Sequence, residues 1–196
     1  MRKSILILAL LMLLGSAVPA FAANDDFGLA WGVSLPTGNT SDFISKVSFR
    51  GAVVEWRHNY RRDLAYGLNA GWNVFNSQTD ETLEWGDSAV TGRIWRYVNA
   101  VPLYAGWYKT FGTDRRDTRL YLGLNAGTAY VERRADMGLS TLEEKTWHVA
   151  VAPEVGIHFP WDAFIGYTAL RYHYAFDAGS FGSEQWLELK IGFGFD

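Results

Sequence analysis

The chain of 196 residues contains no cysteine. It therefore cannot use disulfide bonds, and no thiol is available for lipid attachment near its N-terminus. Basic residues are not in surplus either, since 18 Lys and Arg stand against 21 Asp and Glu, for a formal net charge of −3. A nucleic-acid-binding protein would need a basic face, so we expect no nucleic-acid partner.

Long hydrophobic runs are also missing after the first 22 residues. The run from Ile5 to Leu14 is about half of the roughly 20 residues that a membrane-spanning helix needs. It follows Arg2 and Lys3 and precedes small residues that end at Ala22. This order predicts a cleaved secretory signal peptide over residues 1–22 and a single mature domain over residues 23–196.

What the sequence has instead is alternation. The residues from Gln185 to Phe195 place an apolar side chain at every second position, and charged residues or glycine lie between them. A strand directs successive side chains to opposite faces, so one face is apolar and the other is polar or bare. The chain also combines 20 Gly and 31 aromatic residues with a mean hydropathy near zero. Both features are typical of transmembrane β-barrels.

We read eight such strands along the mature chain, and most of them alternate cleanly. The expected strands cover residues 27–35, 46–57, 64–75, 90–111, 118–131, 147–157, 163–176 and 185–195. Three connectors are short, and four are mostly longer and polar or Gly-rich, including residues 76–89 and 134–146. Short turns at the periplasmic rim and longer loops outside are typical of outer-membrane barrels.

Three strands leave the lipid-facing side open. In the second strand Val47 and Phe49 lie on one face but Val54 lies on the other, so either a bulge or a lumen-facing valine is needed. The fourth strand, which Pro102 interrupts, fits with either of its faces toward lipid. The first half of the seventh strand fits poorly to any alternation.

The sequence resembles the small eight-stranded outer-membrane barrels of the OmpA/OmpX type. The resemblance rests on the signal peptide, the strand count and the closing strand, and it covers residues 27–195. It implies an all-β, antiparallel, up-and-down transmembrane barrel in the cell outer membrane of a Gram-negative-type bacterium. It also implies that the barrel-insertion machinery reads the closing strand as an insertion signal, although Asp196 follows the final aromatic residue. The signal residues would be Leu187, Leu189, Ile191, Phe193 and Phe195.

Aromatic residues recur near both ends of the expected strands. Such rows match the girdles in which amphipathic rings lie among lipid headgroups. The alternative is a platform for a carbohydrate or another ligand. The tryptophans assigned to the girdle are Trp56, Trp72, Trp147, Trp161 and Trp186.

Four charged residues of the last three strands are expected inside the lumen: Glu154, Arg171, Glu188 and Lys190. An eight-stranded barrel has room for little more than its own side chains, and unpaired charges there would be costly. We therefore expect an ion network that fills the lumen as a plug. The functional alternative is a gated or selective narrow pore.

Catalysis is the other alternative, because His148 and His173 are expected to face inward near the outer rim, close to Ser180 and Ser183. Some small barrels are lipid A acylases or deacylases, and one deacylase family carries a His-x-Ser-Asn signature. Here His173 is followed by Tyr-Ala-Phe, which lacks the serine, so we assign no catalytic residue. No His-x-x-x-His motif or carboxylate cluster supports a metal, and we expect no cofactor.

The expected function is accordingly that of a monomeric integral outer-membrane barrel with a structural, surface-interaction or narrow-pore role. A lipid A-modifying enzyme is the alternative, and a soluble exported sandwich or lipocalin-like binder is the competing fold. Outer-membrane lipids and the insertion machinery are the expected partners. The sequence does not identify a ligand.

Overall fold

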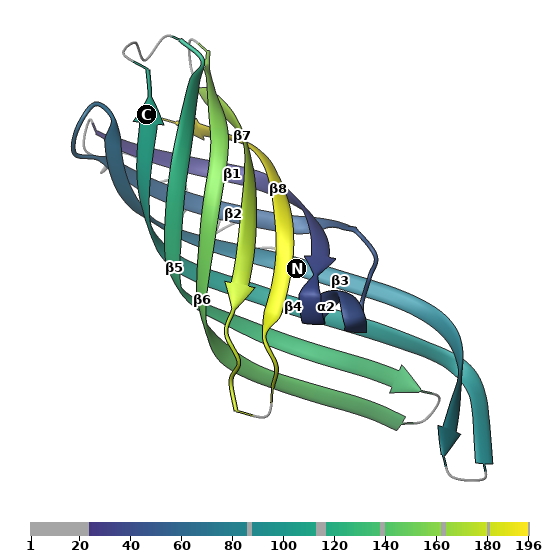
Figure 1. Cartoon of the computed structure of the whole chain (residues 1–196). Helices are drawn as coiled ribbons and strands as arrows, with labels where there is room; N and C mark the ends of the chain where they lie inside the picture. Colours follow the sequence, from purple (N-terminus) through teal and green to yellow (C-terminus); the bar gives the residue numbers. More distant parts are fainter. Residues whose placement is uncertain are drawn as a thin grey trace, which may run out of the picture.

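The computed structural model describes residues 24–85, 88–112, 117–137, 140–161, 164–179 and 181–195, which form one closed antiparallel barrel (Figure 1). Each strand pairs with its neighbours in sequence, and β1 closes the barrel against β8. Within these residues no helix has the length and hydropathy to cross a bilayer. The elements are β1 (Asp25–Thr37), α2 (Gly38–Phe43), β2 (Ser48–Asn59), β3 (Leu64–Trp85), β4 (Ser88–Phe111), β5 (Arg119–Met137), β6 (Ser140–Pro160), β7 (Ile165–Ala175) and β8 (Glu184–Phe195). The predicted fold class is therefore confirmed.

The alternation separates two faces as the sequence predicts. In β5, Leu120, Leu122 and Leu124 are exposed on the outer surface, and Tyr121 and Asn125, at odd-numbered positions, are fully buried. β1, β6 and β8 show the same arrangement, with apolar side chains on the outer surface and small or polar residues inside. This is the reverse of what a soluble protein shows. An apolar outer surface of this kind requires lipid as its solvent.

A β-bulge resolves the ambiguity of the second strand. Between the pairs Gly32↔Gly51 and Ser34↔Ser48, β2 carries one residue more than β1. The extra residue switches the side that alternate residues face, so Phe49 and Val54 are both exposed and Val53 faces the lumen. The bulge therefore turns the second half of β2 with its odd-numbered residues inward.

The other two uncertain strands also have a single orientation. In β4, Leu103 and Trp107 face outward, and Tyr104 and Tyr108 are buried inside the barrel. The strand continues through Pro102, which it keeps in register opposite Ala129. In β7, the inward residues include Tyr167 and Arg171, so the first half of this strand contributes a large aromatic ring to the lumen.

Two of the predicted outer loops are wrong. Residues 76–85 and 88–89 extend β3 and β4, and residues 134–137 and 140–146 extend β5 and β6. These four strands stay paired beyond the barrel, as the register from Ile94↔Met137 to Ala100↔Val131 shows. Figure 1 shows the two hairpins projecting together past α2. Outside the membrane both faces of a sheet can be solvated, so a polar strand there carries no clear hydrophobic alternation.

The lumen near α2 has an apolar core. Ile44, which follows α2, is buried there together with Phe75, Phe181 and Trp186. The helix packs against β8 and β1 and lies across this end of the barrel. The projecting hairpins lie at the same end, so we assign it to the outside of the cell and the turn-bearing end to the periplasm. The predicted signal peptide and Asp196 lie outside the described residues.

Candidate functional site: the barrel lumen

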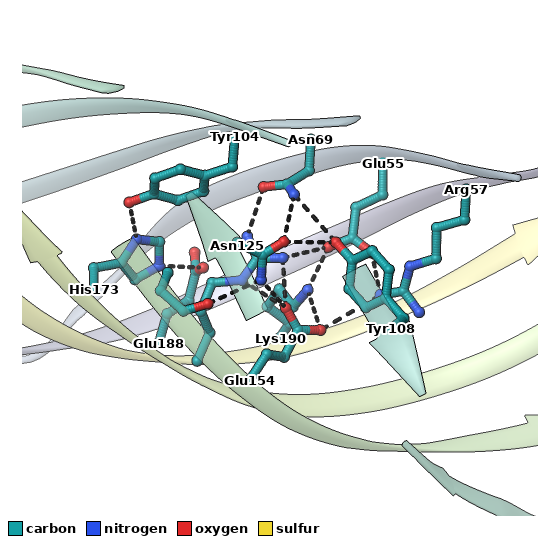
Figure 2. Close-up of polar contacts among 12 residues, drawn as sticks. Glu55, Arg57, Asn69, Tyr104, Tyr108, Asn125, Glu154, His173, Glu188 and Lys190 are labelled. Atoms are coloured by element: carbon teal, nitrogen blue, oxygen red, sulfur yellow. Dashed lines mark hydrogen bonds and ion pairs between the residues drawn. The ribbon is translucent and has the colours of Figure 1, made fainter. Parts of the chain in front are cut away.

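Six buried charged residues lie in the middle part of the lumen, and five of them are in direct ionic contact (Figure 2). Three are acids and three are bases, so the group has no net formal charge. They are Glu55 and Arg57 of β2, Glu154 of β6, Arg171 of β7, and Glu188 and Lys190 of β8. Their balance matters because an unpaired charge in a low-dielectric interior is strongly destabilising.

Arg171 contacts both central carboxylates, Glu55 and Glu154, and an amide of a third strand. Its Nε donates to Glu154 Oε2 over 2.7 Å, and its Nη2 lies 2.9 Å from Glu55 Oε1. Its Nη1 donates to Asn69 Oδ1 over 3.0 Å. One planar guanidinium thus joins β7 to β6, β2 and β3 across the lumen, which is the geometry that arginine supports better than lysine.

Lys190 and Arg57 bind the same two carboxylates from other directions. Lys190 Nζ contacts Glu55 and lies 2.8 Å from Glu154 Oε1. Arg57 Nη2 donates to Glu55 Oε2 over 2.8 Å, and its guanidinium lies 4.0 Å from the ring centroid of Tyr108. Each of the two central carboxylates, Glu55 and Glu154, therefore contacts three cations. These contacts cannot be treated as isolated ion pairs.

A frame of amides and tyrosines extends the hydrogen bonding. Asn69 Nδ2 and the Tyr108 hydroxyl both donate to Asn125 Oδ1, over 2.9 and 2.7 Å. Asn125 Nδ2 donates to the carbonyl oxygen of Ala152, and the Tyr121 hydroxyl donates to Glu154 over 2.6 Å. The polar network therefore reaches from β2 around to β8.

Glu188 belongs to a second chain of hydrogen bonds toward the outer end. His173 Nε2 lies 3.0 Å from Glu188 Oε2, and His173 Nδ1 lies 3.1 Å from the Tyr104 hydroxyl. The carboxylate can only accept, so Nε2 carries the proton and the tyrosine donates to Nδ1. The imidazole is thereby fixed between two partners.

Trp186 packs on this histidine, which corrects its predicted place in the outer girdle. Its ring stacks on His173 with centroids 4.4 Å apart, and it is 1% exposed. The residue precedes outward-facing Leu187, so the alternation itself directs it inward. An aromatic ring near a strand end is therefore assigned to the lipid interface only when the alternation of its strand directs the side chain outward.

Beyond Trp186 the lumen is closed by apolar and ionic contacts around Glu184. Arg133 forms an ion pair with this carboxylate, and the Thr40 hydroxyl of α2 also donates to it. The Arg133 guanidinium lies 5.0 Å from the Phe181 ring centroid. Together with Ile44, these groups fill the outer half of the barrel.

The structure brings together three of the four charges that the sequence assigns to the lumen, Glu154, Arg171 and Lys190. The fourth, Glu188, is also buried in the lumen but bonds His173 instead. The sequence did not identify Glu55 and Arg57, because their parity depends on the β2 bulge. The sequence does contain an indication of their place. Glu55 and Arg57 are two residues apart, so they lie on the same face of the strand, and Arg57 precedes a short turn. Asn69 and Asn125 lie on the inward sides of their strands, but alternation alone does not indicate that they join the network.

The other predicted site residues lie on the outer surface. Trp72, Trp147 and Trp161 are each more than half exposed, and Trp56 is half-buried against Tyr66. Their depth in a bilayer stays a prediction. The side chains of Leu189, Ile191, Phe193 and Phe195 are exposed and that of Leu187 is half-buried, as an insertion signal on the lipid face requires; its reading by the insertion machinery also stays a prediction.

The histidines do not form the arrangement that a hydrolase needs. His148 Nδ1 bonds the carbonyl oxygen of Phe176 over 2.7 Å, and His173 is enclosed as described above. The Ser183 hydroxyl accepts from Asn39 and Gln185. No hydrogen bond joins a serine to a histidine within the described ranges, which exclude Ser180. Over the same ranges no group of His, Asp and Glu residues is arranged to hold a metal.

The projecting sheet carries a charged cluster of its own. Arg134 Nε and the Thr141 hydroxyl both donate to Asp136 Oδ1, over 2.9 and 2.7 Å. These two hydrogen bonds, that from Arg134 above all, hold the pKa of Asp136 below its ordinary value. The cluster lies at the end of the β5–β6 hairpin, where it ties the two strands together in solvent.

Comparison with known proteins gives structural matches only. No family model matches the chain, and no curated protein sequence matches it. The Neisserial surface protein A superposes with a TM-score of 0.56 at 12% identity, covering 88% of this chain and 97% of that one. A major outer membrane protein from Thermus thermophilus superposes with a TM-score of 0.56 at 11% identity, covering 87% and 98%. At these identities the likeness shows the fold, and the chain has the fold of the small eight-stranded outer-membrane β-barrels, with the apolar outer surface that residence in the outer membrane requires.

Proposed function

We propose that this protein is a non-conducting outer-membrane barrel whose filled lumen makes it a rigid support for the sheet that projects outside the cell. The observation that carries the proposal is the two-part filling of the lumen. The charge-balanced network crosses the middle of the barrel, and the apolar group around Ile44, Phe181 and Trp186 occupies the outer half.

The filling argues against a pore on physical grounds. An ion that crossed the outer half would have to leave water among buried aromatic and aliphatic side chains. In the middle it would have to break contacts that join Arg171 to carboxylates on two other strands. Eight-stranded barrels have an interior just wide enough for side chains, so no bypass is available.

The test is conductance in planar lipid bilayers with the purified, refolded protein. We expect no steady conductance from the wild-type protein under conditions in which a porin conducts. A steady wild-type conductance that Glu154→Gln enlarges or abolishes would refute the proposal, because it would place the current in the lumen. Migration of unboiled and boiled samples on a gel confirms that each preparation is folded.

The projecting sheet supplies the surface role. Among the described residues, the outer part of β3 has no partner strand on its β2 side, because that ladder ends at Gly51↔Asn73. The outer part of β6 likewise extends past the end of β7. Exposed Trp95 and Leu142 lie on this sheet. Free edges and apolar side chains are the features through which sheets bind partner strands.

The stability of the barrel can be tested without part of the projecting sheet. For this test the β3–β4 hairpin is shortened at the pair Gln78↔Trp95 and closed with Asn-Gly. The shortened barrel should fold and resist unfolding like the parent, because every member of the apolar core around Ile44, Phe75 and Trp186 lies outside the removed residues. Loss of the folded gel band would show that the projecting sheet is needed by the barrel itself.

A further inference from the structure

The periplasmic end of the lumen holds a vestibule that the plug does not occupy. Its volume is about 530 Å³, and it lies below Arg57, among the ends of seven of the eight strands. The lining includes three arginines, Arg57, Arg62 and Arg119, against two acids, Asp26 and Glu55. Both acids already accept hydrogen bonds, Asp26 from Asn59 over 2.7 Å and Glu55 from Arg57 and Arg171.

His158 lines this space, and the tautomer of its ring follows from its neighbour. Arg57 Nη1 lies 3.2 Å from His158 Nε2. A guanidinium can only donate, so Nε2 is the acceptor and the proton of the neutral ring lies on Nδ1. His158 Nδ1 has no hydrogen-bond partner within the described part of the chain.

Two further buried donors share this condition. The Tyr167 hydroxyl and Arg57 Nε have no partner among the residues that the structure describes, and both side chains are more than nine-tenths buried. The three groups are close together: the Tyr167 ring centroid lies 6.4 Å from that of His158 and 5.9 Å from Arg57 Cζ. Buried donors without acceptors are costly, and few occur in a folded protein.

We propose that the vestibule binds a small oxyanion, a carboxylate or phosphate group, which enters from the periplasmic end. Such a group supplies acceptors to the Tyr167 hydroxyl, His158 Nδ1 and Arg57 Nε. The arginines of the lining supply the opposite charge. The binding site goes beyond the supporting role proposed above, since it requires neither a sealed nor a conducting lumen.

The experiment titrates the refolded protein in maltoside micelles, which contain neither charge nor phosphate. Sodium phosphate and sodium acetate are the probes, with sodium chloride holding the ionic strength constant. Binding is read by calorimetry and by the NMR signals of the His158 ring nitrogens and the Tyr167 Cζ. Tyr167→Phe removes one donor and keeps the ring, and Tyr172→Phe is the matched control at the other end of the same strand.

We expect saturable shifts of both side-chain signals with at least one of the two probes. Tyr167→Phe should weaken binding about tenfold, the size of one hydrogen bond to a charged group, and Tyr172→Phe should leave it unchanged. If the wild-type signals do not move, or move equally with chloride, the proposal is wrong. Equal weakening by both phenylalanine variants would also overturn it.

A second arm identifies the source of the anion. The same signals are compared in nanodiscs of phosphatidylglycerol without added phosphate. Shifts already present there, with no further change on titration, assign the oxyanion to a lipid headgroup. Shifts that appear only with the soluble probe assign it to a periplasmic solute. Neither result bears on conductance, so failure here leaves the proposed support role standing.

Discussion

Removal of the Arg171 guanidinium is the sharpest test of the lumen network. Methionine has a similar length and keeps most of the apolar packing, so Arg171→Met isolates the charge. The substitution deletes the contacts with Glu154 and Glu55 and the bond to Asn69. Of the six buried charges it leaves three carboxylates and only two cations, Arg57 and Lys190, so this group gains a net negative charge.

The expected loss follows from this imbalance. Removing one partner of a buried ion pair costs about 3–5 kcal/mol, chiefly because the remaining charge is left buried and unpaired. Combining Arg171→Met with Glu154→Gln restores the balance, because two cations, Arg57 and Lys190, and two carboxylates, Glu55 and Glu188, then remain in the group. The double variant should therefore be destabilised by less than the sum of the two single variants, with a coupling of about 1–3 kcal/mol.

The measurement is equilibrium unfolding in urea of the barrel refolded into lipid vesicles, followed by tryptophan fluorescence and gel mobility. Lys109→Met is the matched control, because its ion pair with Asp63 lies in solvent and should contribute little. If Arg171→Met unfolds at the same urea concentration as the wild type, the buried guanidinium does not stabilise the barrel. If the two single effects simply add, Arg171 and Glu154 are not energetically coupled.

Two further predictions concern the faces of the strands. A spin label at Ile191 should be accessible to a lipid-dissolved quencher, and a label at Val53 should not, because the β2 bulge turns Val53 into the lumen. An accessible label at Val53 would show that β2 has no bulge at this position. Gly156→Ala should destabilise the barrel by about 1–3 kcal/mol in the same urea assay, since the added Cβ would lie 2.5 Å from the Tyr121 ring. Gly92→Ala, where the added Cβ meets no atom within 4 Å, is its control, and equal effects of the two would show that the lumen is not tightly packed there.

The strand count and the inward and outward faces of most strands could be predicted from the sequence, because the membrane requires an apolar side chain at every second position. Leu122 and Ile191 must face lipid, so their neighbours must face inward, and a period of two is enough to place Glu154 and Lys190 in the lumen. The rule fails where one residue is added. The β2 bulge reverses the parity between Phe49 and Val54, and nothing in the hydrophobic pattern fixes its position.

The rule also ends where the membrane ends. Residues 76–85 and 134–137 are strands held by pairing with neighbours, and a sheet solvated on both faces needs no apolar face. The partners of Arg171 could not be predicted for a different reason. Glu55 lies 116 positions away along the chain, and its approach depends on closure of the barrel, which brings β2 opposite β7.

The charges in the lumen also bear on why the barrel has one register. A lumen filled with aliphatic side chains would make both faces of every strand apolar, and a strand shifted by one residue would then lose little free energy. Glu154, Arg171 and Lys190 each occupy an inward-facing position of their own strand. A shift of one residue would move such a charge into the lipid, at a cost of several kcal/mol near the bilayer centre. The penalty applies to three neighbouring strands at once, β6, β7 and β8, the last of which carries the closing seam with β1. The network therefore specifies the pairing through the states that it excludes, and this effect persists even if a well-packed apolar lumen would be equally stable.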